Sequence, residues 1–209
     1  LENNVVRFKV KNYDPTSTLV IDPTQVFFTY VGSTQDNWGY TATYGPDGSF
    51  FSGGISFGVG FPTSPGAYST GFNSGKFDIA IMILTPDGTN RVYATYIGGN
   101  REEQPHSLIA DQQGNLIIAG RSNSDNYPVT VPKIGVGGGW DIVVTKLNAA
   151  GNALIGSMRI GGSADDGVNI RDKEVQSGTK SLNRNYGDDS RSEVRMDGSN
   201  NFYLASCTR

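Results

Sequence analysis

Acidic side chains recur at one position of a repeated sequence pattern. At each of three places an acidic residue lies four residues after a glycine, and a second polar residue follows that acid directly. Clustered carboxylate oxygens are ligands that Ca²⁺ favours, so Asp36, Glu102, Asp165 and Asp166 are candidate calcium ligands. A structural role, in which each acid accepts hydrogen bonds from backbone N–H groups of the following turn, is the favoured alternative. The three pairs are Asp36 and Asn37, Glu102 and Glu103, and Asp165 and Asp166.

Two further acids repeat in the same way. Asp78 and Asp141 each follow an aromatic residue and precede an apolar run, and no histidine or second acid near them in the sequence could act as a base. A nucleophile elbow, a phosphate-binding loop, a dinucleotide fingerprint and zinc-ligand spacing are all absent from the sequence. Catalysis requires an asymmetric cluster, whereas repeated residues are usually architectural. The prediction is that this chain is not an enzyme and that it needs no cofactor.

One polar stretch has no counterpart elsewhere in the chain. Asn169–Asp189 interrupts the third occurrence of the repeat with many charged residues. It is either a solvated loop or a binding element, because insertions on a repeat scaffold commonly carry specificity. The candidate binding residues in it are Arg171, Lys173, Arg184, Tyr186 and Asp188.

The elements that must position these side chains are short β-strands. The runs "FFTYVGST", "YATYIGGN" and "GSMRIGGS" each end at a glycine turn, and Gly32, Gly98 and Gly161 lie 66 and 63 residues apart. A chain with 28 glycines, 11% aromatic and only 18% charged residues favours twisted sheet with tight turns. We therefore predict an all-β array of similar four-stranded antiparallel units.

The units predicted from this period are residues 24–91, 92–154 and 155–209. Within them, "VRMDGSNNFYLAS" of the third unit matches "LIADQQGNLIIAG" of the second, after the insertion 169–189. Residues 1–23 have no later counterpart. They read as a β-hairpin that either closes a preceding β-rich domain or leads into the array.

The motifs of the second unit resemble a known repeat. The series "TYIGGN", "EE", "IADQQGNLIIAGRSNSDNYP" and "GGGWDIVVTKLNAAGN" is similar to the SBBP-type β-propeller repeat of exported proteins of Bacteroidetes. The resemblance implies β-propeller blades in an incomplete ring of about two and a half units. It also implies a large protein exported by the type IX secretion system, of which this chain is a fragment.

These features lead to a functional expectation. Net charge is −3 and no basic stripe occurs, so nucleic acid is not an expected partner. We expect a non-enzymatic module, extracellular or on the bacterial cell surface near the outer membrane, that binds protein or glycan in adhesion or gliding. The alternatives are the scaffold of an exported hydrolase, or a docked subunit of an outer-membrane secretion or gliding complex. Further partners would be the remaining blades of its own longer chain and outer-membrane proteins.

Overall fold

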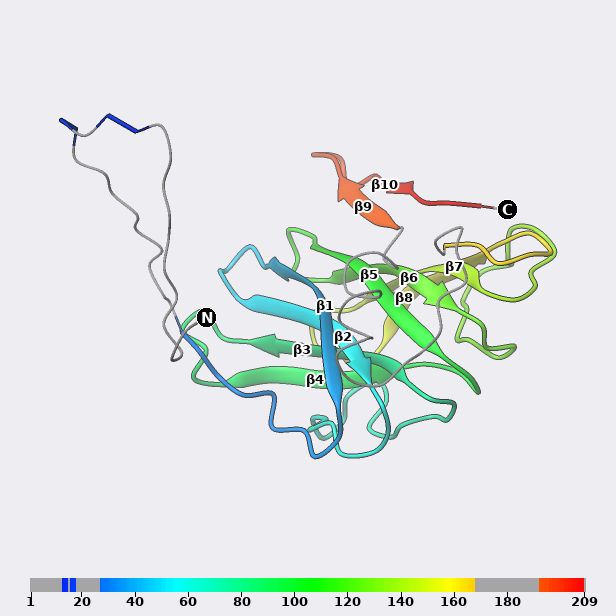
Figure 1. Ribbon diagram of the computed structural model, residues 1–209, viewed down its shortest axis with the longest axis horizontal. Coiled ribbons are helices and arrows are strands. Elements are labelled where there is room, and N and C mark those ends of the chain that lie inside the picture. Colours follow the sequence, from blue (N-terminus) through cyan, green and yellow to red (C-terminus); the bar gives the residue numbers. More distant parts are fainter. Residues whose placement is uncertain (1–12, 15, 18–26, 168–191, 209) are drawn as a thin grey trace.

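The computed structural model describes residues 13–14, 16–17, 27–167 and 192–208. Within these ranges all regular structure is β-strand (Figure 1), and no helix is long and apolar enough to span a membrane. The predicted all-β class is confirmed. The strands are β1 (Asn37–Tyr44), β2 (Phe50–Ser56), β3 (Asp78–Leu84), β4 (Arg91–Ile97), β5 (Glu103–Ala110), β6 (Leu116–Ser122), β7 (Asp141–Leu147), β8 (Leu154–Ile160), β9 (Glu193–Met196) and β10 (Phe202–Ala205).

The strands form two antiparallel sheets of four and one hairpin. The sheet orders follow the chain, β1-β2-β3-β4 and β5-β6-β7-β8, and β9 pairs with β10. Consecutive strands can pair in this way because tight turns join most of them. At one such turn Asp111 accepts hydrogen bonds from the backbone N–H groups of Gln113 and Asn115. Four-stranded antiparallel sheets are the form that a propeller blade takes.

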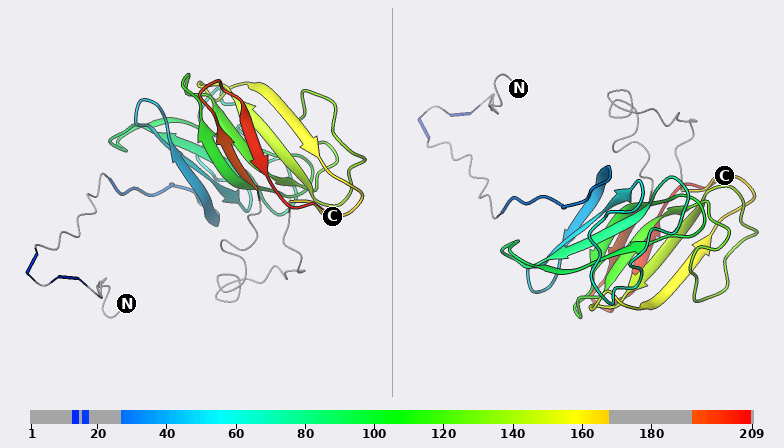
Figure 2. Two further views of the ribbon diagram at one scale, coloured as in Figure 1. Left: turned by 90° about the horizontal axis from the view of Figure 1, so that it is seen from above. Right: turned by 90° about the horizontal axis from the view of Figure 1, so that it is seen from below.

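The two large sheets stack face to face, and the hairpin continues the stack (Figure 2). Ile79 and Ile81 of β3 are fully buried against Leu108 and Ile118 of the second sheet. On the other face of the second sheet, Val194 of β9 is buried with Ile117 and other side chains. The continuous apolar run of β3, whose seven residues are all buried, is explained by packing on both of its faces.

The units of the sequence repeat and the four-stranded sheets begin at different points of the chain. The run "YATYIGGN" contains the end of β4, the last strand of the first sheet, and the chain then crosses through Gly98 and Gly99 to β5. Each sequence unit beginning at 92 or 155 therefore contains the last strand of one sheet and the first strands of the next. A sequence period identifies the repeat length but not the point at which the chain moves to a new sheet.

After β8, the third unit continues with the hairpin of β9 and β10. Asp197 accepts hydrogen bonds from the backbone N–H groups of Ser199 and Asn201, as Asp111 does from those of Gln113 and Asn115. This shared turn supports the alignment of the third unit with the second. The insertion Asn169–Asp189, including all five of its candidate binding residues, lies outside the described residues.

The run "FFTYVGST" does not form the strand that the sequence predicts. Residues 27–34 form no strand. Their position in the repeat corresponds to that of β4, which pairs with the third strand of its sheet. None of the described residues forms an equivalent third strand for residues 27–34 to pair with. Phe27 nevertheless lies over Gly88, as Tyr93 lies over Gly151 one repeat later. In the hairpin predicted near the start of the chain, only the turn is described, with Ser17 N donating to Asp14 O.

Candidate functional site

The candidate site lies at one end of the stacked sheets. It contains the starts of β1, β3, β5 and β7 and the ends of β2, β4, β6 and β8, which the antiparallel register places together. We call this end the Trp140 rim. The same rim carries both tryptophans of the chain and the repeated acids.

A buried pair of acids joins the first sheet to the second at this rim. Asp78 and Glu103 are both fully buried. Glu103 accepts hydrogen bonds from Ser122 Oγ at 2.6 Å and from Gly99 N at 3.1 Å, while Asp78 Oδ2 accepts one from Asn73 N at 2.8 Å. Burial above all, together with the neighbouring Glu103 carboxylate, raises the pKa of Asp78 to about 8. A proton on Asp78 lets the two carboxyl groups share a hydrogen bond.

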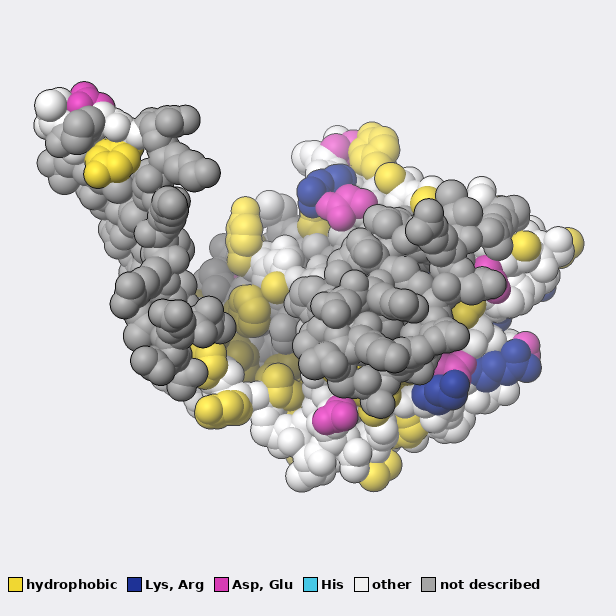
Figure 3. All heavy atoms as spheres, in the orientation of Figure 1, with side chains coloured by type: hydrophobic (Ala, Val, Ile, Leu, Met, Phe, Trp, Pro, Cys, Tyr) yellow, Lys and Arg dark blue, Asp and Glu magenta, His cyan; other side chains and the backbone are white. Residues whose placement is uncertain are grey.

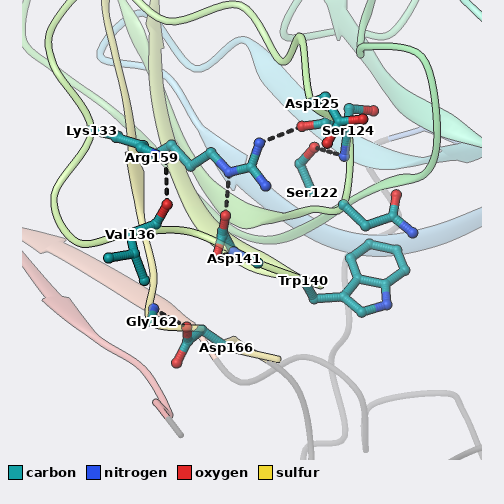
Figure 4. A network of polar contacts seen from close by, with 12 residues as sticks. Ser122, Ser124, Asp125, Lys133, Val136, Trp140, Asp141, Arg159, Gly162 and Asp166 are labelled. Atoms are coloured by element: carbon teal, nitrogen blue, oxygen red, sulfur yellow. Dashed lines mark hydrogen bonds and ion pairs between the residues drawn. The ribbon is translucent and has the colours of Figure 1, made fainter. Parts of the chain in front are cut away.

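The next repeat has a similar acid pair with a different partner. Asp141 and Asp166 are fully buried, and Gly162 N donates to Asp166 Oδ2 at 2.6 Å. Here Arg159 of β8 forms an ion pair with Asp141 and also donates to Ser124 O (Figure 4). The Asp141 carboxylate of this second pair thus lies against a guanidinium group.

The glycines before these acids are needed for close packing. A Cβ atom at Gly98 would lie 2.7 Å from Asp78 Cγ and 2.7 Å from Glu103 Oε2, and Gly98 itself has no left-handed backbone conformation. A built Cβ at Gly161 would likewise collide with Asp141. The sequence interpretation that these glycines serve to turn the chain is correct for Gly32, whose φ is 76°. At Gly98 and Gly161 the reason is the neighbouring carboxylate.

The four calcium candidates belong to three different repeats, and only Asp165 and Asp166 are neighbours in the chain. Asp36 is exposed, Glu102 accepts from Asn123 Nδ2 at 2.6 Å, and Asp165 accepts from Trp140 N at 2.9 Å. Within the described ranges, no three His, Cys, Asp or Glu side chains come close enough to hold a metal ion. Glu103 and Asp166 accept from backbone N–H groups, but these belong to the preceding Gly-Gly turn and not to the following one.

A row of aromatic side chains crosses the Trp140 rim from one sheet to the other. Trp38 and Phe57 lie edge to face at 5.0 Å between ring centroids, and Phe57 and Phe77 at 5.6 Å. Phe77 is stacked on Trp140 of the second sheet at 6.4 Å. Trp38, Phe57 and Trp140 remain partly exposed. The row therefore combines packing between sheets with ring surface open to solvent.

Polar groups accompany the aromatic row. The Arg121 guanidinium lies 4.3 Å from the centroid of the Trp140 ring, and its Nε donates to Gln104 Oε1 at 2.9 Å. Gln104 is only 1% exposed, and its Nε2 has no hydrogen-bond partner among the described residues. An unpaired buried amide is costly unless a further group pairs with it.

Beside Trp140 is a small charged pocket of about 180 Å³. We call it the Arg159 pocket, and Figure 4 shows part of its wall. Its walls come from the connections after β4 and β6, from the loop before β7 and from β8. The lining residues are Arg101, Asn123, Asp125, Lys133, Gly137, Gly138, Gly139 and Arg159.

A different surface lies on the outer face of the first sheet. An apolar groove of about 380 Å³ is lined there by Trp38, Phe50, Phe61 and Met82, among others. Figure 3 shows hydrophobic side chains exposed on this side of the molecule, and charged side chains gathered at the lower right. The equivalent face of the second sheet is covered by the first sheet. The groove is thus a blade-packing face.

Comparison with protein families identifies the repeat. A family model described as a β-propeller repeat, SBBP, matches residues 92–128. The chain contains an SBBP β-propeller repeat. The match starts in β4 and ends after β6, so it spans the crossing between two blades, as the shifted phase of the sequence repeat requires. A search of curated proteins finds no match to this chain.

The pocket and the aromatic row were not identified from the SBBP pattern. Their residues are scattered over several loops, and a reading of motifs alone leaves them unconnected. A signal was nevertheless present, because Arg159 occupies the repeat position at which Tyr96 stands one blade earlier. Comparing the units position by position, rather than looking for what they share, would have singled it out.

Proposed function

We propose that this chain is a non-enzymatic propeller module that binds a glycan through the Trp140 rim, outside the cell. The observation that carries the proposal is the row of four rings, three of them partly exposed, that runs from Trp38 to Trp140 across two blades. The apolar C–H faces of sugar rings pack on aromatic rings, while their hydroxyl groups need nearby hydrogen-bonding groups.

The chemistry beside the row fits such a ligand. Arg121 places a planar hydrogen-bonding group over the Trp140 ring, and the buried Gln104 orients it by accepting from Arg121 Nε at 2.9 Å. Tryptophan and arginine are also the side chains most enriched where binding energy concentrates. The rigid blades hold these groups in place, so little conformational entropy is lost on binding.

Intrinsic fluorescence provides a direct test. Both tryptophans of the chain belong to the aromatic row, so glycan binding should change the emission of the intact protein. A panel of neutral and acidic oligosaccharides would be titrated, with calorimetry as a second readout. We expect Trp140→Ala to weaken binding by about tenfold or more. Trp38→Phe keeps the ring packing and isolates the emission of Trp140.

A matched control lies at the opposite end of the first sheet. Tyr44, at the end of β1, is 79% exposed and distant from the Trp140 rim along the strand. Tyr44→Ala should leave binding unchanged. The proposal fails if no glycan changes the fluorescence, or if Tyr44→Ala weakens binding as much as Trp140→Ala does.

A further inference from the structure

The Arg159 pocket combines an excess of positive charge with a small volume. Three of its lining side chains are cationic and one is acidic, and the adjacent Asp141 carboxylate pairs with Arg159, so the cations exceed these carboxylates by one. Its volume of about 180 Å³ is below the range of roughly 300–1,000 Å³ that encloses a drug-sized ligand. A pocket of this size holds one charged group or one sugar unit, with the rest of a larger ligand outside it.

The pocket exists because the repeat is broken at Arg159. The equivalent position on β4 is Tyr96, whose ring contacts Phe61 and Phe72 at centroid distances of 5.6 and 5.9 Å. The Tyr96 hydroxyl donates to Gly58 O at 2.8 Å. In the first blade this region is therefore occupied by packed aromatic rings. A position that is architectural in one blade and cationic in the next is a candidate for a specific role.

The cationic groups are held in fixed positions. Arg159 donates through Nε to the buried Asp141 carboxylate and through Nη1 to Ser124 O, and Lys133 Nζ donates to Val136 O (Figure 4). A guanidinium group oriented by a buried carboxylate loses less entropy when it meets an oxyanion. The wall of the pocket is preorganised for a ligand with negative charge.

Backbone forms the remaining wall. Gly137 has a φ of 72°, and a Cβ atom there would lie 3.1 Å from Asp141 Oδ2 and 3.4 Å from Lys133 Nζ. Any side chain at this position would be strained and would crowd the groups that orient the charges. Three consecutive glycines thus bring bare backbone to the pocket, beside Trp140.

From these observations we infer that the Arg159 pocket binds the acidic group of a glycan, a carboxylate or a sulfate ester, whose sugar ring packs on the Trp140 rim. The inference rests on the proposed function and names the class of glycan. The pocket's positive charge contrasts with the chain's net charge of −3. Charge complementarity at the pocket thus discriminates acidic from neutral sugars.

The test uses the whole chain and two exposed cations of the pocket. Arg101 forms a surface ion pair with Asp125, with side chains 53% and 68% exposed, and its Nη1 donates to Asn123 O at 3.5 Å. Lys133 is exposed too. Their replacement should hardly affect folding. Binding of oligogalacturonate, which carries carboxylates, of dextran sulfate and of neutral dextran would be measured by calorimetry. We expect Arg101→Ala and Lys133→Ala each to weaken binding of one acidic glycan by roughly tenfold.

The matched control is Arg195→Ala in β9. Its side chain is 73% exposed and pairs with Glu193, outside the pocket. It should leave binding unchanged. The inference is overturned if all three variants weaken binding equally, since general electrostatics would then explain it. It is also overturned if the protein binds neutral dextran as tightly as either acidic glycan, a result that leaves the proposed function intact. If no glycan binds, both fail.

Discussion

Asp78 of β3 and Glu103 of β5 face each other across Gly98, at the junction between the first and second blades. Neither forms an ion pair within the part of the chain that the structure describes. One repeat later, Arg159 pairs with Asp141 at the corresponding junction. The same architectural position is thus neutralised by a proton at one junction and by a guanidinium at the next.

This difference predicts a pH dependence of stability. The pKa of Asp78 rises on folding from its ordinary value of 3.8 to about 8, so between these values the native state holds a proton that the unfolded state lacks. The free energy of unfolding should therefore fall as pH rises through this range, by up to about 1.4 kcal/mol per pH unit. In Asp78→Asn an amide replaces the protonated acid. Urea unfolding across this range should show a much flatter dependence, and an unchanged slope would contradict the assignment.

The corresponding change at the second junction should behave differently. Asp141→Asn leaves Arg159, only 13% exposed, without its carboxylate. Breaking a buried ion pair on one side typically costs about 3 kcal/mol or more. We expect a stability below that of the wild type in the same urea experiment. A stability equal to wild type would show that the pair contributes nothing.

Gly98→Ala tests the close packing of the first acid pair. The new methyl group would lie 2.7 Å from both Asp78 and Glu103, and overpacking of this kind typically costs about 1–3 kcal/mol. Gly156→Ala is the control, because a Cβ atom there meets nothing within 4 Å. Thermal unfolding of the two variants should separate them clearly. Equal melting temperatures would mean that the junction relaxes freely.

Ile81→Ala tests the packing between blades. Ile81 is fully buried in the cluster that joins the two large sheets, so its truncation should cost about 2–5 kcal/mol. Val92 is an apolar residue of the same sheet that is 50% exposed, and Val92→Ala should cost less than about 1 kcal/mol. Chemical denaturation measures both. A small effect at Ile81 would argue against face-to-face stacking of the sheets.

Asp111→Ala should destabilise the turn between β5 and β6. The carboxylate accepts hydrogen bonds from the backbone N–H groups of Gln113 and Asn115 and from Asn115 Nδ2, and pairs with Lys146 at 2.8 Å. Losing these contacts should cost about 1–3 kcal/mol. Gln112→Ala, in the same turn, serves as the control. Hydrogen exchange of β5 and β6 would locate the effect, and uniform protection in both variants would contradict it.

The features predicted correctly are those that repeat. The all-β class and the four-stranded units follow from local patterns of glycine and alternating apolar residues. The strand near Phe27 was not found, because a strand also needs a neighbour to pair with. The role of Gly98 was misread, since its closest contacts come from Asp78 and Glu103, and Asp78 lies far away in sequence.

The sequence by itself determined the repeat, the strand content and the SBBP character of residues 92–128, because these depend on short-range periodicity. Only the tertiary structure decided where one blade ends and which side chains meet at the Trp140 rim. Arg101, Lys133 and Arg159 come from separate segments, and they line one pocket because antiparallel pairing brings alternate strand ends to the same rim. Contacts between distant segments are set by packing, which a linear pattern does not encode.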